Sequence, residues 1–309
     1  MKRQIGTLIV VFCYIKGRKK MRKIIIEVGS TCTKVDCYDG EAVSHLATVT
    51  ILFKKHYKEE GHLLPADVST LIQKVQQYAQ EATSVYVCGT SIFRSLSQEE
   101  KDHFLHQFKQ ETGYPFHILS DLQENEYTVF GATRHVTGKV AVVVAGGGST
   151  EIAVYDKTIQ EMVNTPMGVI DILQEYPDLG EDIATTPLDT VVSYVKDKLQ
   201  VPTEKVDTII LAGGAHLYFA KESGITYEEN TLYVDELQPI MMDIQRRKAD
   251  TKRYFEEISM DAIRNRVEDP DWWYATRGMC ALVLAIAEKM EARYIVPTDI
   301  SMVYGLLEQ

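Results

Sequence analysis

The chain carries the stretch Val140-Ala-Val-Val-Val-Ala-Gly-Gly-Gly-Ser-Thr-Glu151, its strongest structural signal. The first six residues are apolar and mostly β-branched, which is typical of a buried strand. The three glycines predict a tight turn, because glycine adopts backbone conformations closed to other residues and lets a ligand come close. Backbone N–H groups in such a turn form an anion site, to which Ser149 and Thr150 add hydroxyl groups.

Glu151 gives this turn a second property. A carboxylate next to a bound phosphate is repelled by it, unless a metal ion or an attacking water lies between the two. The stretch therefore predicts phosphate chemistry assisted by a metal. An ordinary glycine-rich hairpin is the alternative for the motif taken alone.

Two more apolar runs end in glycine. Residues 24–28, with Glu27 inside the run, lead into Gly29-Ser30-Thr31, and residues 208–212 lead into Gly213-Gly214. Each run predicts a strand followed by a turn. Three such turns can converge on one phosphate-bearing ligand, which makes their order along the chain more informative than any single one.

Composition bounds the class of protein. The chain has 309 residues, 45% of them hydrophobic and 25% charged, enough for two globular domains. Its net charge of −11 argues against nucleic acid or anionic membrane as a partner. The five cysteines contain no CxxC pair. This pattern excludes a typical zinc site or disulfide framework and favours a reducing cytoplasm.

The N-terminus forms a segment of its own. Residues 5–15 are apolar but too few to span a bilayer, and the basic residues 16–20 separate them from Met21. We expect residues 1–22 to be an extension outside the packed fold, with Met21 as the true start of translation. A short anchor at the membrane surface is the alternative, and stable membrane insertion is not expected.

Strand and helix patterns alternate along the remaining chain. Strands are predicted over 23–28, 84–89, 116–119, 140–145, 152–155, 207–212 and 294–297, and helices over 65–82, 97–113, 122–133, 187–199, 238–263, 278–290 and from 299. Strands followed by helices, twice over, predict two similar α/β halves with a cleft between them.

The motif order resembles a known family. Glu27-Val-Gly-Ser-Thr31, Gly89-Thr-Ser-Ile-Phe-Arg94, Gln123-Glu124 and Gly146-Gly-Gly-Ser-Thr-Glu151 follow one another as in the exopolyphosphatase/guanosine pentaphosphate phosphatase (Ppx/GppA) family. Met167-Gly168, Leu211–Gly214 and Gly278 continue the series. The resemblance covers residue 23 to the C-terminus. It implies an actin-like ATPase fold with two ribonuclease-H-like subdomains, residues 23–134 and 135–309, the last helix packing back on the first.

The resemblance also implies an activity and its residues. Family members hydrolyse terminal phosphates from polyphosphate or guanosine pentaphosphate. By likeness, Glu124 matches the catalytic base and Glu151 a second acid. The phosphate contacts would come from Ser30, Thr31, Arg94, Gly147, Gly148, Ser149 and Thr150. Magnesium is the expected metal, with Glu27 and Glu151 as its protein ligands. The partner implied is polyphosphate or a phosphorylated guanine nucleotide, and a homodimer is a further expectation.

Several positions depart from the family pattern. Glu27 and Val144 stand where the family has Asp, and Gln123 stands where it has Glu. Asp121 and Val303 replace a glycine and an arginine. A non-catalytic or weakly active sensor of nucleotides is therefore an alternative to a hydrolase. A cofactor-reactivating ATPase is a third reading, which residues 29–34 also resemble.

Overall fold

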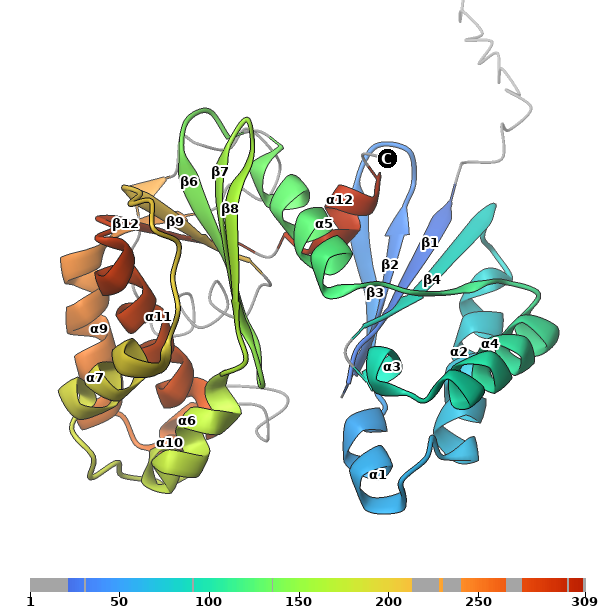
Figure 1. The fold of residues 1–309 in the computed structure, drawn as a ribbon, viewed down its shortest axis with the longest axis horizontal. Helices are drawn as coiled ribbons and strands as arrows, with labels where there is room; N and C mark the ends of the chain where they lie inside the picture. The colour runs from blue at the N-terminus through green and yellow to red at the C-terminus, as the bar shows by residue number, and fades with distance from the viewer. Residues whose placement is uncertain are drawn as a thin grey trace, which may run out of the picture. The chain divides into compact units, whose positions relative to one another are not determined.

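The computed structural model describes residues 22–30, 32–90, 92–134, 136–212, 228–229, 240–264, 274–298 and 300–307. The chain forms two compact units that divide between Ile118 and Leu119. The expected division after residue 134 therefore differs from this one by the length of a helix, α5 (Asp121–Thr133). The helix belongs with the second unit because it packs along α12 (Met302–Leu307) (Figure 1).

The sheet of the first unit has the strand order β3-β2-β1-β4-β5. Its strands are β1 (Lys23–Val28), β2 (Cys32–Tyr38), β3 (Val43–Thr50), β4 (Ser84–Gly89) and β5 (Phe116–Ile118). The first three strands are antiparallel neighbours, because short turns join them. Strands β4 and β5 run parallel to β1, since helical crossovers separate them in sequence.

Side chains alternate across this sheet and so define its two faces. Ile24, Ile26 and Val28 of β1 belong to a core that also includes residues of the helices α1 (Phe53–Glu60), α2 (Pro65–Ala79) and α4 (Gln98–Thr112). Ile25 and Glu27 therefore point to the opposite face, which we call the second face. The helix α3 (Ile92–Ser95) follows β4.

The sheet of the second unit repeats that order. Strands β8-β7-β6-β9-β12 are arranged like β3-β2-β1-β4-β5, and β11 and β10 extend the sheet beyond β12. The strands are β6 (Val140–Ala145), β7 (Thr150–Asp156), β8 (Thr158–Thr165), β9 (Thr208–Leu211), β10 (Glu228–Glu229), β11 (Ile240–Asp243) and β12 (Tyr294–Pro297). Two sheets with one strand order confirm the predicted pair of similar α/β halves.

Helices cover both faces of the second sheet. The larger core contains residues of α6 (Val169–Glu175), α7 (Leu188–Lys198), α9 (Ile244–Glu256) and α11 (Thr276–Met290), while α5 and the segment leading into α12 pack on the other face (Figure 1). A short helix η1 (Pro177–Gly180) and α10 (Met260–Arg264) complete the unit. Among the described residues, no helix combines the length and apolar composition needed to cross a bilayer.

Two sequence expectations need correction. The helix expected over 238–263 begins only at Ile244, because residues 240–243 pair as β11 with β12. Residues 53–60, over which no helix is predicted, form α1. Of the expected extension over residues 1–22, residues 1–21 lie outside the described residues, as do the glycines 213 and 214; Arg22 is described and accepts from the amide of Thr83.

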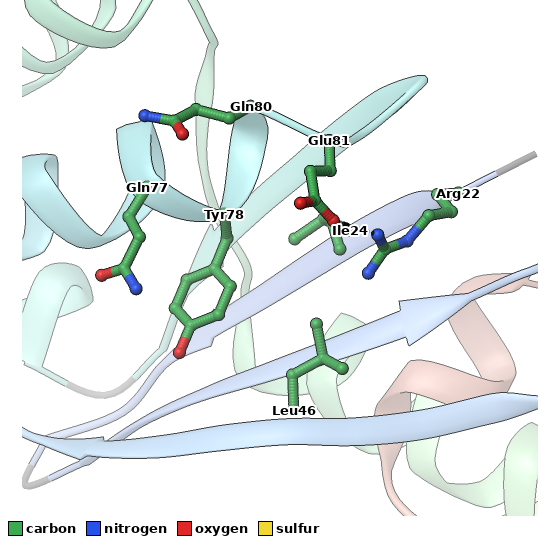
Figure 2. Close-up of a pocket in the computed structure, with 7 residues that line it drawn as sticks. All are labelled: Arg22, Ile24, Leu46, Gln77, Tyr78, Gln80 and Glu81. Atoms are coloured by element: carbon green, nitrogen blue, oxygen red, sulfur yellow. Dashed lines mark hydrogen bonds and ion pairs between the residues drawn. The ribbon is translucent and has the colours of Figure 1, made fainter.

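One cavity of about 430 Å³ occurs in the first unit (Figure 2). It is lined by Arg22, Ile24, Leu46, Gln77, Tyr78, Gln80 and Glu81. Arg22 forms an ion pair with Glu81 at its edge. Because Arg22 and Ile24 stand at the start of β1, this cavity lies at the opposite end of the strand from the turn at Gly29.

Candidate functional site

The turn after β1 is closed by backbone hydrogen bonds. The amide of Gly29 donates to the carbonyl oxygen of Cys32 at 2.9 Å, and the carbonyl oxygen of Ser30 accepts from the amide of Lys54 at 3.0 Å. A Cβ atom on Gly29 would lie 3.0 Å from that Cys32 oxygen. A side chain at Gly29 would therefore push the Cys32 carbonyl by a few tenths of an ångström, and the turn is tied to the first residues of α1.

Two polar atoms at this turn are buried without a hydrogen-bond partner among the described residues: Glu27 Oε2 and Ser30 Oγ. Buried polar atoms in native proteins nearly always have a partner, so an unsatisfied pair needs an explanation. A cation for the carboxylate oxygen and a phosphate oxygen for the hydroxyl group would both supply one. Thr31, which the sequence analysis placed beside them, lies outside the described residues.

Arg94 is held at the same end of the first sheet. The amide of Thr90, directly after β4, donates to the carbonyl oxygen of Val28 at the end of β1, at 3.1 Å. The amide of Phe93 donates to the Thr90 carbonyl at 3.1 Å and starts α3. Arg94 is half-buried in that helix, and Lys101 Nζ donates to its carbonyl oxygen at 2.8 Å. The structure thus brings Arg94 and Ser30 to neighbouring strand ends.

The triple-glycine turn of the second unit joins β6 to β7. The amide of Gly146 donates to the carbonyl oxygen of Ser149 at 2.9 Å. Gly147 and Gly148 are exposed, and among the described residues their amides donate to no protein group. The buried Thr150 hydroxyl donates to the carbonyl oxygen of Met167 at 2.8 Å. Two glycine amides therefore remain available to an anion, whereas Thr150 is used to hold the turn.

A second loop clamps this turn from the side. The amides of Val169 and Ile170 donate to the carbonyl oxygens of Gly146 and Gly147, at 3.1 and 2.9 Å. A Cβ atom on Gly168 would lie 2.5 Å from backbone atoms of all three glycines of the turn. Only a residue without a side chain allows the start of α6 to approach so closely.

Glu151 and Val144 are cross-strand partners on one sheet face. They pair between β7 and β6, next to the triple-glycine turn. Ala153, two residues along from Glu151, belongs to the core under α5, which places both side chains on the face that α5 covers. Val144 is partly buried against that core.

Glu124 lies in the first turn of α5 and is half-buried. Residues of α5 pack on the sheet face that carries Glu151. Glu124 thus lies in the helix that covers the face of Glu151, while Glu27 belongs to the first unit.

Gln123 has a structural task. Its side-chain oxygen accepts from the amide of Ser120 at 3.0 Å, and its own amide donates to Ser120 Oγ at 3.2 Å. The two residues form a capping box, which satisfies amides at the start of α5. Gln123 therefore fixes the helical turn that carries Glu124.

Comparison with known proteins gives the chain its family. A family model described as the Ppx/GppA phosphatase family matches residues 42–268, more than half of the chain. This chain belongs to the Ppx/GppA phosphatase family. A search of curated protein sequences finds no match.

Solved structures share the Ppx/GppA fold. The type II variant of the Aquifex aeolicus Ppx/GppA phosphatase is 18% identical, with 93% of this chain and 98% of that chain covered and a TM-score of 0.76. An exopolyphosphatase from Cytophaga hutchinsonii is 14% identical over 93% and 97% of the two chains, with a TM-score of 0.68. Nucleoside triphosphate hydrolases from Neospora caninum are 10% identical over 93% and 92%, with a TM-score of 0.59.

No group of three or more His, Cys, Asp and Glu side chains is arranged to hold a metal ion within the part of the chain that the structure describes. The magnesium site of this Ppx/GppA chain therefore stays a prediction.

A hydrogen-bonded pair of the buried Asp36 and the half-exposed His45, on the face of Glu27, was not foreseen from the sequence. His45 Nδ1 lies 2.9 Å from Asp36 Oδ1, and the Asp36 carboxyl is nearly inaccessible to solvent. Burial raises the pKa of Asp36 and outweighs the hydrogen bond from His45, which lowers it; the charge of Glu27 raises it further. Alternation along β2 puts Asp36 on the second face with Glu27. This alternation of side chains along β2 was the one feature of the sequence that could have placed Asp36 near Glu27.

Proposed function

We propose that this chain hydrolyses phosphoric anhydrides, releasing the terminal phosphate of inorganic polyphosphate or guanosine pentaphosphate by attack of water. One observation carries the proposal. The exposed residues Gly147 and Gly148, whose amides donate to no described protein group, lie next to Glu151, on the second sheet, and the helix of Glu124 covers the face of Glu151. A phosphate cradle beside two carboxylates suits phosphoryl transfer, which needs bound phosphate, an oriented nucleophile and neutralised charge.

The residues divide these tasks between them. The amides of Gly147 and Gly148 and the hydroxyl groups of Ser30 and Ser149 bind phosphate oxygens. Arg94 adds a guanidinium group, whose fork of donors matches two phosphate oxygens. Glu124 accepts a hydrogen bond from the attacking water and orients it.

The acids fit a hard divalent cation. Glu27 and Glu151 would hold magnesium, and the buried, partnerless Oε2 of Glu27 supports this assignment. When bound, the metal neutralises charge on the phosphate oxygens.

Substitution of Glu124 tests the proposal. Glu124→Gln keeps the size of the side chain and removes its charge. Because general-base catalysis contributes about 10²- to 10⁴-fold, we expect phosphate release to fall by at least about 10²-fold. Release is measured with magnesium on polyphosphate, guanosine pentaphosphate and ATP. Glu126→Gln, on the same helix, is the matched control.

Two results would contradict the proposal. If Glu124→Gln were as active as wild type, Glu124 would not be the general base. If phosphate were released from ATP alone, the chain would be a cofactor-reactivating ATPase instead. Thermal unfolding of each variant excludes loss of fold as the cause.

A nucleotide sensor without catalysis is the second candidate. Val144, the partner of Glu151 in the ladder, puts an apolar side chain where the family has an acid. With fewer carboxylates, the site retains groups that bind phosphate but holds a metal less firmly. Tight binding of guanosine pentaphosphate with no phosphate release by wild type would select this candidate.

Compartment and assembly remain proposals as well. No disulfide joins the described cysteines Cys32, Cys37, Cys88 and Cys280, which supports a cytoplasmic protein. A homodimer stays a prediction, to be measured by light scattering.

A further inference from the structure

Two glycines allow α5 and α12 to touch through their backbones. A Cβ atom on Gly305 of α12 would lie 1.9 Å from the carbonyl oxygen of Tyr127 in α5. A Cβ atom on Gly131 of α5 would lie 3.0 Å from the amide nitrogen of Gly305 and from the carbonyl oxygen of Ser301. The contact thus moves from Gly131 back to Tyr127 as the chain proceeds from Ser301 to Gly305. The two helices are therefore antiparallel, and α12 runs toward the start of α5 (Figure 1).

Glu124 lies one helical turn before this contact. It precedes Tyr127 by three residues, which is about 4.5 Å along the helix axis. The hydroxyl group of Thr128 donates to the carbonyl oxygen of Glu124 at 3.0 Å and adds a side-chain bond to this turn. Because hydrogen bonds within the helix make a single turn stiff, a displacement of Tyr127 carries Glu124 with it.

The segment that leads into α12 is fixed to the sheet that carries the triple-glycine turn. The amide of Thr298 donates to the carbonyl oxygen of Leu211 in β9 at 3.0 Å, and Leu211 pairs with Val143 in β6. Strand β6 leads directly into the triple-glycine turn. Ile300 is fully buried in the core on the face that α5 covers. Because these contacts hold α12 in place, it cannot simply retreat from α5.

We propose that Gly305 is a positioning residue for the reaction, because the backbone contact of α12 with α5 fixes the place of Glu124 relative to the triple-glycine turn. This inference rests on the proposed function. On the sheet side of α5, Val129 and Ala132 are buried in a filled core, so α5 has no free space to move into. The phosphate turns belong to other segments of the chain. A side chain at Gly305 should therefore impair catalysis more than substrate binding.

The experiment compares variants that require different displacements. Ordinary contact begins at 3.4 Å, so Gly305→Ala needs a shift of 3.4 − 1.9 = 1.5 Å, and Gly131→Ala needs 3.4 − 3.0 = 0.4 Å. Since a misplacement of about 1 Å costs on the order of 10²-fold in rate, kcat for phosphate release should fall by about that factor or more in Gly305→Ala. It should fall less in Gly131→Ala, and KM should stay within about 2-fold of wild type in both.

Val195→Ala is the matched control. Val195 is fully buried in the core of α7 and belongs to neither helix of the contact. Its truncation should lower the urea concentration at the midpoint of unfolding while leaving kcat unchanged. A fall in kcat as large as that of Gly305→Ala would mean that lost stability alone explains the effect, which overturns the positioning role.

A double variant shows whether Gly305 acts through Glu124. In the Glu124→Gln background, Gly305→Ala should lower kcat by less than about 3-fold further, because a displaced base that is already absent costs nothing more. If the two changes instead multiply in full, Gly305 acts on something other than Glu124 and the inference is overturned. Should Gly305→Ala fail to fold, Gly131→Ala takes its place in the same cycle.

Failure of the proposed function gives a different result. In that case Glu124→Gln is as active as wild type, or wild type releases no phosphate from any substrate. Hydrogen exchange of the amides of Gln123 and Glu124, which bind Ser120, then tests the contact itself. Faster exchange of these amides in Gly305→Ala than in Val195→Ala supports the inference, and equal rates overturn it.

Discussion

Gly168→Ala tests whether the clamp at the start of α6 sets the phosphate turn. The added Cβ atom would lie 2.5 Å from Gly146 O, Gly147 C and Gly148 N, all of them backbone atoms. Ordinary contact begins at 3.4 Å, so the turn must retreat by 3.4 − 2.5 = 0.9 Å or more. A flexible side chain could rotate away, but a backbone held by two amides cannot.

The expected effects follow from this displacement. A shift of about 1 Å in a group that positions substrate costs on the order of 10²-fold in rate, so kcat/KM for phosphate release should fall by about that factor. Overpacking should also lower the free energy of unfolding by about 1–3 kcal/mol. Release of phosphate and urea unfolding measure the two effects separately.

Gly180→Ala is the matched control. A Cβ atom there would come no closer than 4.0 Å to Tyr274 O, and the residue has no left-handed backbone. Its stability should change by less than about 1 kcal/mol, with unchanged activity. The reasoning is refuted if Gly168→Ala keeps wild-type kcat/KM, because the clamp then does not position the turn.

Three further variants test the fold. Gly305→Ala should separate α12 from α5 and destabilise the protein by about 1–3 kcal/mol in urea unfolding, because its Cβ atom would lie at a backbone oxygen of α5. Arg277→Met should cost about 3 kcal/mol or more, since the buried guanidinium donates to four carbonyl oxygens. Glu288→Gln should cost about 1 kcal/mol at pH 7. Burial raises the pKa of Glu288, but hydrogen bonds from Lys248 and Lys196 outweigh it and lower that pKa below 4.5. This stabilisation is therefore lost as the pH falls below 4.5 and Glu288 becomes protonated.

Each of these variants can fail in its own way. If Gly305→Ala unfolded at the same urea concentration as wild type, the packing of α12 on α5 would not depend on the close approach of the two backbones. An Arg277→Met protein as stable as wild type would show that water satisfies the carbonyl groups. If Glu288→Gln still had a lower free energy of unfolding than wild type at acid pH, packing rather than charge would be the cause.

The central strands of both sheets, β1 with β4 and β6 with β9, could be predicted because they are dense apolar runs. Residues 140–145 and 23–28 are buried on both faces, and glycines end them. The helix predicted over 97–113 is confirmed as α4, and its start has a local signal, the capping box that Ser97 and Glu100 form. Strand β11 depends on pairing with β12, about 50 residues further on, so its sequence alone did not separate it from a helix.

The site shows the same division between local and distant information. The turns at Gly29 and at Gly146–Gly148 could be predicted, since the glycines and hydroxyl residues that mark them are adjacent in the sequence. The buried Arg277 binds carbonyl oxygens almost 100 residues away, and no pattern in the sequence predicts these hydrogen bonds. The face shared by Glu124 and Glu151 also needed the strand register, because a single-residue slip would put Glu151 on the other side.

The division after Ile118 has a consequence for biogenesis. The chain crosses from one unit to the other only once, so all strands of the first sheet are synthesised before any strand of the second. Domains that are continuous in sequence fold as units, the N-terminal one first, while the ribosome is still translating. The first half can therefore reach its native form on the ribosome, without waiting for the triple-glycine turn to emerge.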